Sequence, residues 1–234
     1  MRKNQIIAAF RAAFPYTLPI LAGYWFLGLT YGVLMQKNGF SWIWPTLMAM
    51  WIYSGSVEFL AVNLLLSAFN PVQAFFIALM VGARHLFYGI TMLDRYGHTG
   101  WKKPFLIYMM SDETFSVNYT APVPEGIDRG WLMLWISVLD FFYWSSGACM
   151  GALLGNLITF STKGLDFVMT AMFVCIFTEQ WLKDRSHFSA IAGIAISALS
   201  LLLFGSEYFV IPSMVGMLAV FALVRPRFDK EGGK

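Results

Sequence analysis

The sequence predicts an all-α membrane protein that crosses the bilayer several times. Of its 234 residues, 58% are hydrophobic and only 12% are charged, whereas an average soluble domain carries about 25% charged residues. The mean hydropathy is +0.63, and apolar runs of about 20 residues, enough to cross a bilayer as a helix, recur along the chain. A soluble domain would need polar faces on its helices, and most of these runs have none. The runs are 15–36, 45–69, 71–93, 104–120, 131–158, 165–182, 187–204 and 208–224.

The charges between the runs limit how they cross, because Lys and Arg concentrate in cytoplasmic loops. With the N-terminus inside and all eight runs crossing, ten Lys and Arg residues lie inside and five outside. If 45–69 and 165–182 instead enter and leave on the same side, thirteen lie inside. Lys37 and Arg129 then lie outside, and Arg84 stays within a run. The second arrangement fits the charge rule better.

The predicted architecture is a single integral membrane domain, 1–234, with about six spanning helices and two re-entrant or broken segments. Its halves, 15–120 and 131–224, repeat the same order of segments in opposite orientation. Such inverted repeats place a transporter's site near the bilayer midplane. Seven or eight simple spanning helices are the alternative, since 45–69 is also long enough to cross once. The charge pattern places both termini of this multi-pass protein in the cytoplasm.

The stretch YSGSVEFLAVN, residues 53–63, is the first candidate for a binding site. Ser54, Gly55 and Ser56 form a small, flexible run where we expect the helix to break, and Glu58 then opens the second half-helix. Exposed N–H groups and the positive dipole end favour anions there. These groups could hold a substrate carboxylate while Glu58 receives an amine or a proton. A protonated Glu58, hydrogen-bonded to neighbouring helices, is the structural alternative.

Arg84 and His85 lie deep within the run 71–93. An arginine too deep to reach the surface needs a partner or lines a cavity. Its planar fork suits a carboxylate of the substrate, or a structural ion pair with Asp112 or Glu113. His85 is a candidate for proton coupling, with ordinary packing as the alternative.

Asp112 and Glu113 lie in IYMMSDETFSVN, the least apolar of the runs. Adjacent helical positions point about 100° apart, so one acid can face the site while the other pairs elsewhere. Asp112 is therefore predicted to bind substrate, and Glu58, His85, Asp112 and Glu113 are the candidates for proton coupling. A short interfacial helix exposed to water is the alternative for this segment.

Small residues recur at helical spacing in two of the runs, which favours close packing of helix backbones. Gly23, Gly28 and Gly32 occur in the first run, and Gly147, Gly151 and Gly155 in the run 131–158.

Other function classes find little support in the sequence. The net charge of +3 is explained by the loops between runs and does not indicate nucleic-acid binding. Cys149 and Cys175 lie inside apolar runs, with no spacing typical of a metal site, and no cofactor is predicted. No G-x-S-x-G or H-E-x-x-H motif favours an enzyme. A channel or transporter for another small polar or cationic solute is the alternative, whereas intramembrane charges argue against a subunit with a purely structural function.

Five motifs occur in an order and spacing that resemble a known family. They are PYTLPILAGYWFLGLTYG, YSGSVEFLAVNLL, VGARHLFYGITML, MSDETFSV and GLDFVMTAMFV. Together they resemble the AzlC family, the large subunits of two-component branched-chain amino acid exporters, over roughly residues 11–225. The chain departs from the family at its predicted site, because the family usually carries Gln at the position of Glu58 and Asn at that of Gly82.

The resemblance implies export of leucine, isoleucine, valine or methionine, driven by the proton gradient. It also implies a partner, a small hydrophobic AzlD-like membrane subunit of several helices. An amino acid fits the residues of the predicted site, with Arg84 or a half-helix N-terminus for the carboxylate and acids for the ammonium.

Overall fold

The computed structural model is built of α-helices, and none of the residues that it describes forms a β-strand. It describes residues 2–67, 70–82, 84–157 and 187–209, with isolated positions between 167 and 182 and between 212 and 223. The chain divides into two compact units, 1–169 and 170–234. The first unit contains α1 Arg2–Lys37, α2 Ile43–Trp51, α3 Gly55–Leu66, α4 Pro71–Gly82, α5 Arg84–Gly97, the 3-10 helix η1 Gly100–Lys102, α6 Lys103–Tyr108, α7 Asp112–Thr120 and α8 Arg129–Leu154.

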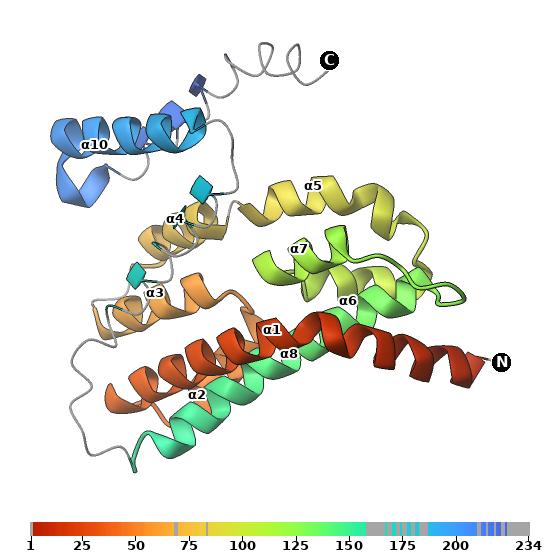
Figure 1. The fold of residues 1–234 in the computed structure, drawn as a ribbon. Helices are drawn as coiled ribbons and strands as arrows, with labels where there is room; N and C mark the ends of the chain where they lie inside the picture. The colour runs from red at the N-terminus through yellow and green to blue at the C-terminus, as the bar shows by residue number, and fades with distance from the viewer. Residues whose placement is uncertain are drawn as a thin grey trace. The chain divides into compact units, whose positions relative to one another are not determined.

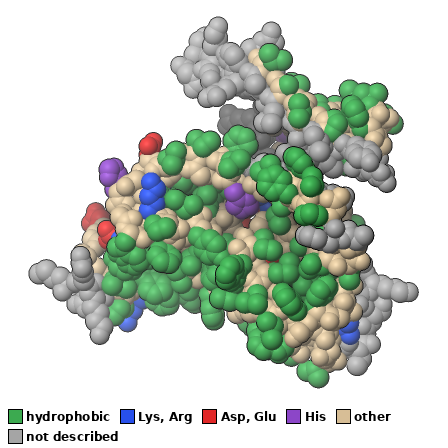
Figure 2. Space-filling view, turned by 180° about the vertical axis from the view of Figure 1, so that it is seen from behind, with side chains coloured by type: hydrophobic (Ala, Val, Ile, Leu, Met, Phe, Trp, Pro, Cys, Tyr) green, Lys and Arg blue, Asp and Glu red, His purple; other side chains and the backbone are tan. Residues whose placement is uncertain are grey.

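Three helices of the described residues are long and apolar enough to cross a membrane. They span Gln5–Lys37 in α1, Arg129–Leu154 in α8 and Phe188–Gly205 in α10, the Phe188–Tyr208 helix of the second unit. Large apolar side chains such as Phe26 and Trp51 are exposed on the first unit, and Figure 2 shows hydrophobic side chains spread over its visible face. This is the surface that a lipid environment selects, so the prediction of an all-α membrane protein is confirmed.

Backbone contact between α1 and α8 forms the centre of the first unit. A Cβ atom added at Gly32 would lie 2.1 Å from the carbonyl oxygen of Ala148, and one at Gly151 would lie 2.1 Å from that of Leu29. No side chain fits at either position, which confirms the close packing that the two glycine stripes predict. Gly23 borders open space and takes no part in this contact.

The segment 45–69 is broken, as predicted. Helix α2 ends at Trp51, Tyr53 has a positive φ of 46°, and Ser54 is extended before α3 begins at Gly55. Trp44 near the start of α2 and Leu64 near the end of α3 line one cavity of about 310 Å³. Helices α2 and α3 therefore form a hairpin whose two open ends lie together (Figure 1), the shape that a re-entrant segment requires.

The segment 104–120 differs from the sequence prediction, which treats it as a crossing. It is a second hairpin, with α6 and α7 joined through Met109–Ser111. Arg95, at the end of α5, donates a 2.7 Å hydrogen bond to the carbonyl of Tyr119 at the end of α7. Lys102, before α6, lies 2.8 Å from Asp128, after α7. Both ends of the hairpin are thus on one side, because a polar tip at Ser111 breaks the apolar run and turns the chain back.

The first unit thus contains, in order, α1, the α2–α3 hairpin, α4 and α5, the α6–α7 hairpin and α8. The two hairpins open toward opposite ends of the unit (Figure 1). Their tips meet in the middle, where the Tyr108 hydroxyl donates to the Met50 carbonyl. The two hairpins lie on either side of Arg84 in the sequence. The predicted relation between 15–120 and 131–224, and the predicted re-entrant segment 165–182, depend on positions outside the described residues.

The second unit is represented by α10. It extends from Phe188 to Tyr208 and has a non-helical Gly205 with a φ of 72°. This conformation favours glycine, because a Cβ atom would clash with the backbone there. The apolar part of the helix ends at this kink.

Candidate functional site

Arg84 lies where the two hairpin tips meet. Its Nη1 is 2.6 Å from Oδ2 of Asp112, and its Nη2 donates a 2.7 Å hydrogen bond to Oγ of Ser56. The arginine begins α5, Asp112 begins α7, and Ser56 is in the first turn of α3. Three residues predicted from the sequence are therefore brought together, and the ion pair considered as an alternative is present.

Two helix N-termini converge on this ion pair. Helix α7 begins with Ser111, whose side chain accepts a hydrogen bond from the backbone N–H of Thr114. Helix α3 begins with Ser54, whose side chain makes no such cap. The first N–H groups of a helix carry a partial positive charge. The tip of the first hairpin is thus the more open of the two to an anion.

Several buried polar atoms around Arg84 have no hydrogen-bond partner. They are Oγ of Ser54, Nε of Arg84 and Oδ1 of Asp112. An unsatisfied buried polar group costs about 1–3 kcal/mol, so such atoms are uncommon unless water or a ligand completes them. Here an N–H donor, a carboxylate acceptor and a hydroxyl lack hydrogen-bond partners at the place where the two hairpin tips meet.

An apolar cavity of about 610 Å³ adjoins the ion pair. Its polar rim includes Ser54 and His85. Ser54 lies two residues before Ser56, which contacts Arg84, and His85 directly follows Arg84. The ring of His85 is half-buried, and its Nδ1 lies 3.2 Å from the carbonyl oxygen of Gly82. The wall is otherwise mostly apolar and includes Ile52, Val57, Leu86, Ile90, Ile107 and Met110.

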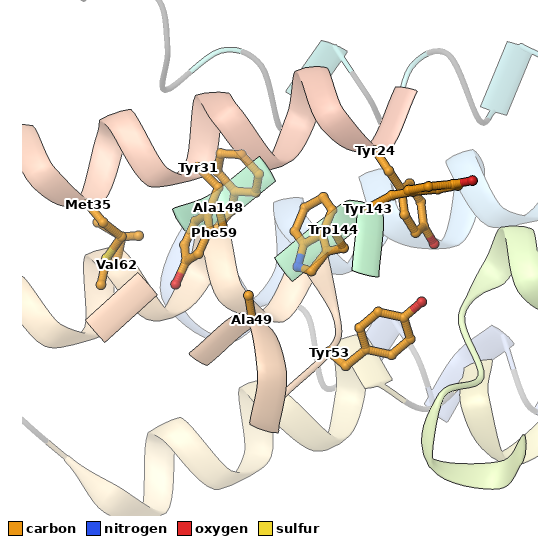
Figure 3. Close-up of a cluster of buried hydrophobic side chains, with 10 residues drawn as sticks. All are labelled: Tyr24, Tyr31, Met35, Ala49, Tyr53, Phe59, Val62, Tyr143, Trp144 and Ala148. Carbon is orange, nitrogen blue, oxygen red and sulfur yellow. The ribbon is translucent and has the colours of Figure 1, made fainter. Parts of the chain in front are cut away.

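Glu58 faces away from Arg84 and is held by its surroundings. Both carboxylate oxygens accept from Nε1 of Trp144, at 3.0 and 3.1 Å, and the backbone N–H of Ser54 donates to one of them at 3.1 Å. The side chain is fully buried. Gly55 makes room for the indole, since a Cβ atom there would lie 2.8 Å from the ring of Trp144. Glu58 and Gly55 thus both contact Trp144 of α8, one of the buried side chains labelled in Figure 3.

Glu113 points in a different direction from Asp112, as the helical spacing predicts. Its Oε2 lies 2.5 Å from the hydroxyl of Tyr24 on α1. The same hydroxyl lies 2.6 Å from Oγ of Ser111, which contacts Oγ1 of Thr114 at 2.9 Å. Thr114 donates at 2.8 Å to Oδ2 of Asp140 on α8.

Sequence reasoning placed neither Tyr24, Trp144 nor Asp140 in the site. The two aromatic residues look like ordinary apolar positions, and their partners lie 86 to 89 residues away in the chain. Asp140 gave a signal, since an acid in the middle of an apolar run needs a partner. No cluster of three metal-ligating side chains occurs among the residues that the structure describes.

Comparison with known proteins places the chain in a family. Residues 19–158 match the profile of the AzlC protein family. The chain is 52% identical to the branched-chain amino acid transport protein AzlC of Bacillus subtilis, over 98% of this chain and 90% of that protein. It is 46% identical to a membrane protein of Haemophilus influenzae, over 94% and 91% of the two chains, and 37% identical to one of Helicobacter pylori, over 97% and 99%. No solved structure matches. The chain belongs to the AzlC family.

Proposed function

We propose that this protein exports small apolar amino acids, the branched-chain ones and methionine, across the bacterial cytoplasmic membrane. The observation that carries the proposal is the pairing of Arg84 with Asp112 between two helix N-termini. Each of the two side chains keeps an atom without a hydrogen-bond partner. The Bacillus subtilis relative is named a branched-chain amino acid transport protein, and that substrate class fits this geometry.

A zwitterion can replace each partner of the ion pair. The α-carboxylate of the substrate binds Arg84 and the first N–H groups of α3, where Ser54 leaves its hydroxyl open. The α-ammonium binds Asp112, whose Oδ1 has no partner. Each buried charge then keeps an opposite charge beside it, so the substrate enters without leaving either residue unpaired.

The cavity beside the pair suits a branched apolar side chain. Its volume of about 610 Å³ falls within the range of small-molecule sites, about 300–1,000 Å³. Val57, Ile90 and Met110 contribute to a wall that makes dispersion contacts and offers few polar partners. A cationic side chain would lose solvation here and would find Lys103, a like charge, in the lining.

Proton coupling and a partner subunit complete the proposal. Inward movement of a proton supplies the energy for outward movement of the amino acid, with His85, Asp112 and Glu113 as the candidate groups. Glu58, the fourth candidate from the sequence, is held by Trp144 and Ser54 and is not assigned to coupling. The family resemblance supports a small hydrophobic AzlD-like membrane subunit as the partner.

The charge distribution supports cytoplasmic N- and C-termini. In the first unit, Arg11, Arg95, Lys102 and Arg129 lie at the same end as the N-terminus, and Lys37 lies at the other. The positive-inside rule makes the basic end cytoplasmic. The C-terminal stretch after residue 224 holds four further basic residues, which this rule also places inside.

Efflux from loaded cells tests the proposed function. Cells that express the chain with a small partner subunit are preloaded with labelled leucine or methionine, and loss of label is followed with and without an uncoupler. We expect faster efflux that depends on the proton gradient, and slower efflux without the partner. Unchanged efflux of every amino acid tested would exclude the exporter. Rapid downhill flux that ignores the uncoupler would instead identify a channel for small solutes.

A further inference from the structure

Two carboxyl groups inside the first unit are joined by three hydroxyls. The chain of contacts runs from Glu113 through Tyr24, Ser111 and Thr114 to Asp140, with oxygen–oxygen distances of 2.5, 2.6, 2.9 and 2.8 Å. All four distances are within the usual range for O–H···O hydrogen bonds. The chain links three helices, because Tyr24 is on α1, Asp140 on α8 and the other members at the start of α7.

The number of hydrogens determines the charge of this chain. Four contacts need four hydrogens, and the three hydroxyls supply only three, since each carries one. If both acids were ionised, one short contact between two oxygens would have no hydrogen. If both were protonated, a fifth hydrogen would have no acceptor within the chain. Four hydrogen bonds therefore form when one of the two acids, Glu113 or Asp140, is protonated and the other is ionised.

The single proton has two equivalent arrangements. In the first, Glu113 donates to Tyr24, and the hydroxyls donate onward to an ionised Asp140. In the second, each hydrogen has moved across its contact to the neighbouring oxygen, so that one O–H bond has broken and another has formed in every contact. Asp140 then donates to Thr114, and Glu113 is ionised. One proton has moved between the acids, and no other bond has changed.

The surroundings shield most of this chain from water. Thr114 and Asp140 are fully buried, Tyr24 and Ser111 are buried as well, and Glu113 at the other end is half-buried. The Tyr53 hydroxyl lies beside Ser111 and Thr114 without a well-formed hydrogen bond, and it faces both acids. Figure 3 shows the rings of Tyr24 and Tyr53 with their hydroxyls directed into the same region.

The charged groups near the chain are few. Glu113 experiences the charges of Asp112 and Arg84, and Asp140 that of Glu113. Because Asp112 and Arg84 are paired, their effects on Glu113 oppose each other. The proton is thus held mainly by the two acids and the hydroxyls between them.

We propose that Glu113, Tyr24, Ser111, Thr114 and Asp140 form a proton relay that holds one shared proton. This inference rests on the proposed proton-coupled export and adds Asp140 and three hydroxyls to its machinery. Glu113 follows directly after Asp112, so substrate bound at Asp112 contacts the first turn of α7, which also carries Glu113. A shift of the α6–α7 hairpin away from α1 and α8 would break the contacts at Tyr24 and Asp140. The chain of hydrogen bonds is therefore complete only when the α6–α7 hairpin packs against α1 and α8.

Infrared spectroscopy of the purified full-length chain in lipid, with its partner subunit, tests the shared proton without any transport assay. The variants are Glu113→Gln, Asp140→Asn and the double variant, and the signal is the carbonyl band of protonated carboxyl groups. An amide N–H supplies the fourth hydrogen in either single variant, so the remaining acid is ionised. We expect both single variants and the double variant to lose the same single carboxyl band. Loss of two bands in the double variant, or of none, would overturn the relay.

Transport in proteoliposomes then tests movement along the chain. Thr114→Val removes the hydroxyl that joins Ser111 to Asp140 at nearly constant volume. Thr120→Val is the matched control, an exposed threonine on the same helix that bonds only within it. We expect leucine movement driven by a pH gradient to fall by about 100-fold in Thr114→Val, the low end of the contribution of a positioned proton donor. Exchange of leucine for leucine, which moves no net proton, should fall far less, and Thr120→Val should behave like the unmodified protein.

The outcomes separate the two proposals. Equal losses of driven movement and exchange in Thr114→Val, or proton-driven movement equal to that of Thr120→Val, would contradict the relay while leaving the exporter in place. Absence of leucine exchange in the unmodified protein would contradict the exporter, and the infrared result would still decide whether the proton is shared.

Discussion

The two hairpins carry acids at the same place and hold them in opposite ways. In each, a serine precedes a helix whose first turn contains carboxylates, Glu58 in α3 and Asp112 and Glu113 in α7. Glu58 is fully buried, and only donors surround it, from Trp144 and from its own hairpin. Asp112 keeps an oxygen without a partner, and Glu113 opens onto a chain of hydroxyls.

This difference shows that depth alone does not identify a functional acid. A fully buried carboxylate held by fixed donors cannot turn to a new partner without losing those hydrogen bonds. An acid with an oxygen that has no hydrogen-bond partner can bind a ligand or pass a proton without breaking existing contacts. The carboxyl group of the first hairpin therefore has a structural character, whereas those of the second hairpin are available to substrate and protons.

The largest expected effect concerns the sides on which the hairpins open. Single cysteines at Ser67 and Glu125, in a chain whose native cysteines are replaced by alanine, lie at the ends of α3 and after α7, and both positions are exposed. A membrane-impermeant thiol reagent should label Ser67→Cys only from outside and Glu125→Cys only after the cytoplasmic face is opened. Labelling of both from one side would mean that α6 and α7 cross the membrane after all.

Charge counting could not have found the second hairpin. A hairpin at 104–120 moves Arg129 inside and Lys163 outside, provided that 165–182 then crosses. One basic residue is exchanged for another, so thirteen remain inside in either arrangement. The break after Trp51 was predictable because Ser-Gly-Ser interrupts an apolar run. The break at Met109–Ser111 lies in an apolar dipeptide before an ordinary serine cap, and only tertiary contacts reveal it.

The candidate site was predictable to a similar extent. A deep arginine needs an acid, so an ion pair of Arg84 with Asp112 or Glu113 followed from the sequence, but the choice of Asp112 did not. The partners of Glu58 and Glu113 did not follow. Tyr24 and Trp144 lie on helices that glycine contacts bring together, and no local pattern tells a hydrogen-bonding aromatic side chain from a packing one.

The next largest effect is expected at the second hairpin. Asp112→Asn removes the charge that pairs with Arg84 at 2.6 Å, and a hydrogen bond to a charged group contributes about 1.5–3 kcal/mol, or about 10- to 150-fold in binding. Amino acid efflux should fall by that factor. Asp94→Asn on α5, an exposed position, is the matched control and should leave efflux unchanged. Normal efflux in Asp112→Asn would remove this acid from the site.

A smaller effect is expected from filling the first hairpin tip. Gly55→Ala places a Cβ atom 2.8 Å from the Trp144 ring, which is buried and bonded to Glu58. The ring must move, and overpacking of this kind costs about 1–3 kcal/mol. The melting temperature of the purified protein should fall, whereas Gly23→Ala, which meets nothing within 4 Å, should not lower it. Equal melting temperatures would show that the contact between α3 and α8 is loose.

Glu58→Gln should change still less, in contrast to the acids of α7. The glutamine oxygen can accept from both Ser54 and Trp144, as Oε1 does now, and one 3.1 Å hydrogen bond is lost. One such bond contributes about 1 kcal/mol. Efflux and its dependence on the proton gradient should stay within about fivefold of the unmodified protein. Loss of proton dependence would return Glu58 to the coupling machinery and erase the contrast between the hairpins.

The smallest effect is expected at the mouth of the second hairpin, where Lys102 meets Asp128. The hydrogen bond from Lys102 lowers the pKa of Asp128, and the backbone N–H of Trp131 lowers it further. Because the folded pKa lies below the unfolded value, the contribution to stability is present above pH about 4 and is lost as the pH falls through the folded pKa. Asp128 is half-exposed, so the pair contributes at most about 1 kcal/mol. Asp128→Asn should lower the melting temperature slightly at pH 7, and the difference from the unmodified protein should vanish in acid. A difference that persists in acid would show that the effect of Asp128 does not depend on its charge. The ion pair with Lys102 would then not hold the ends of the hairpin together.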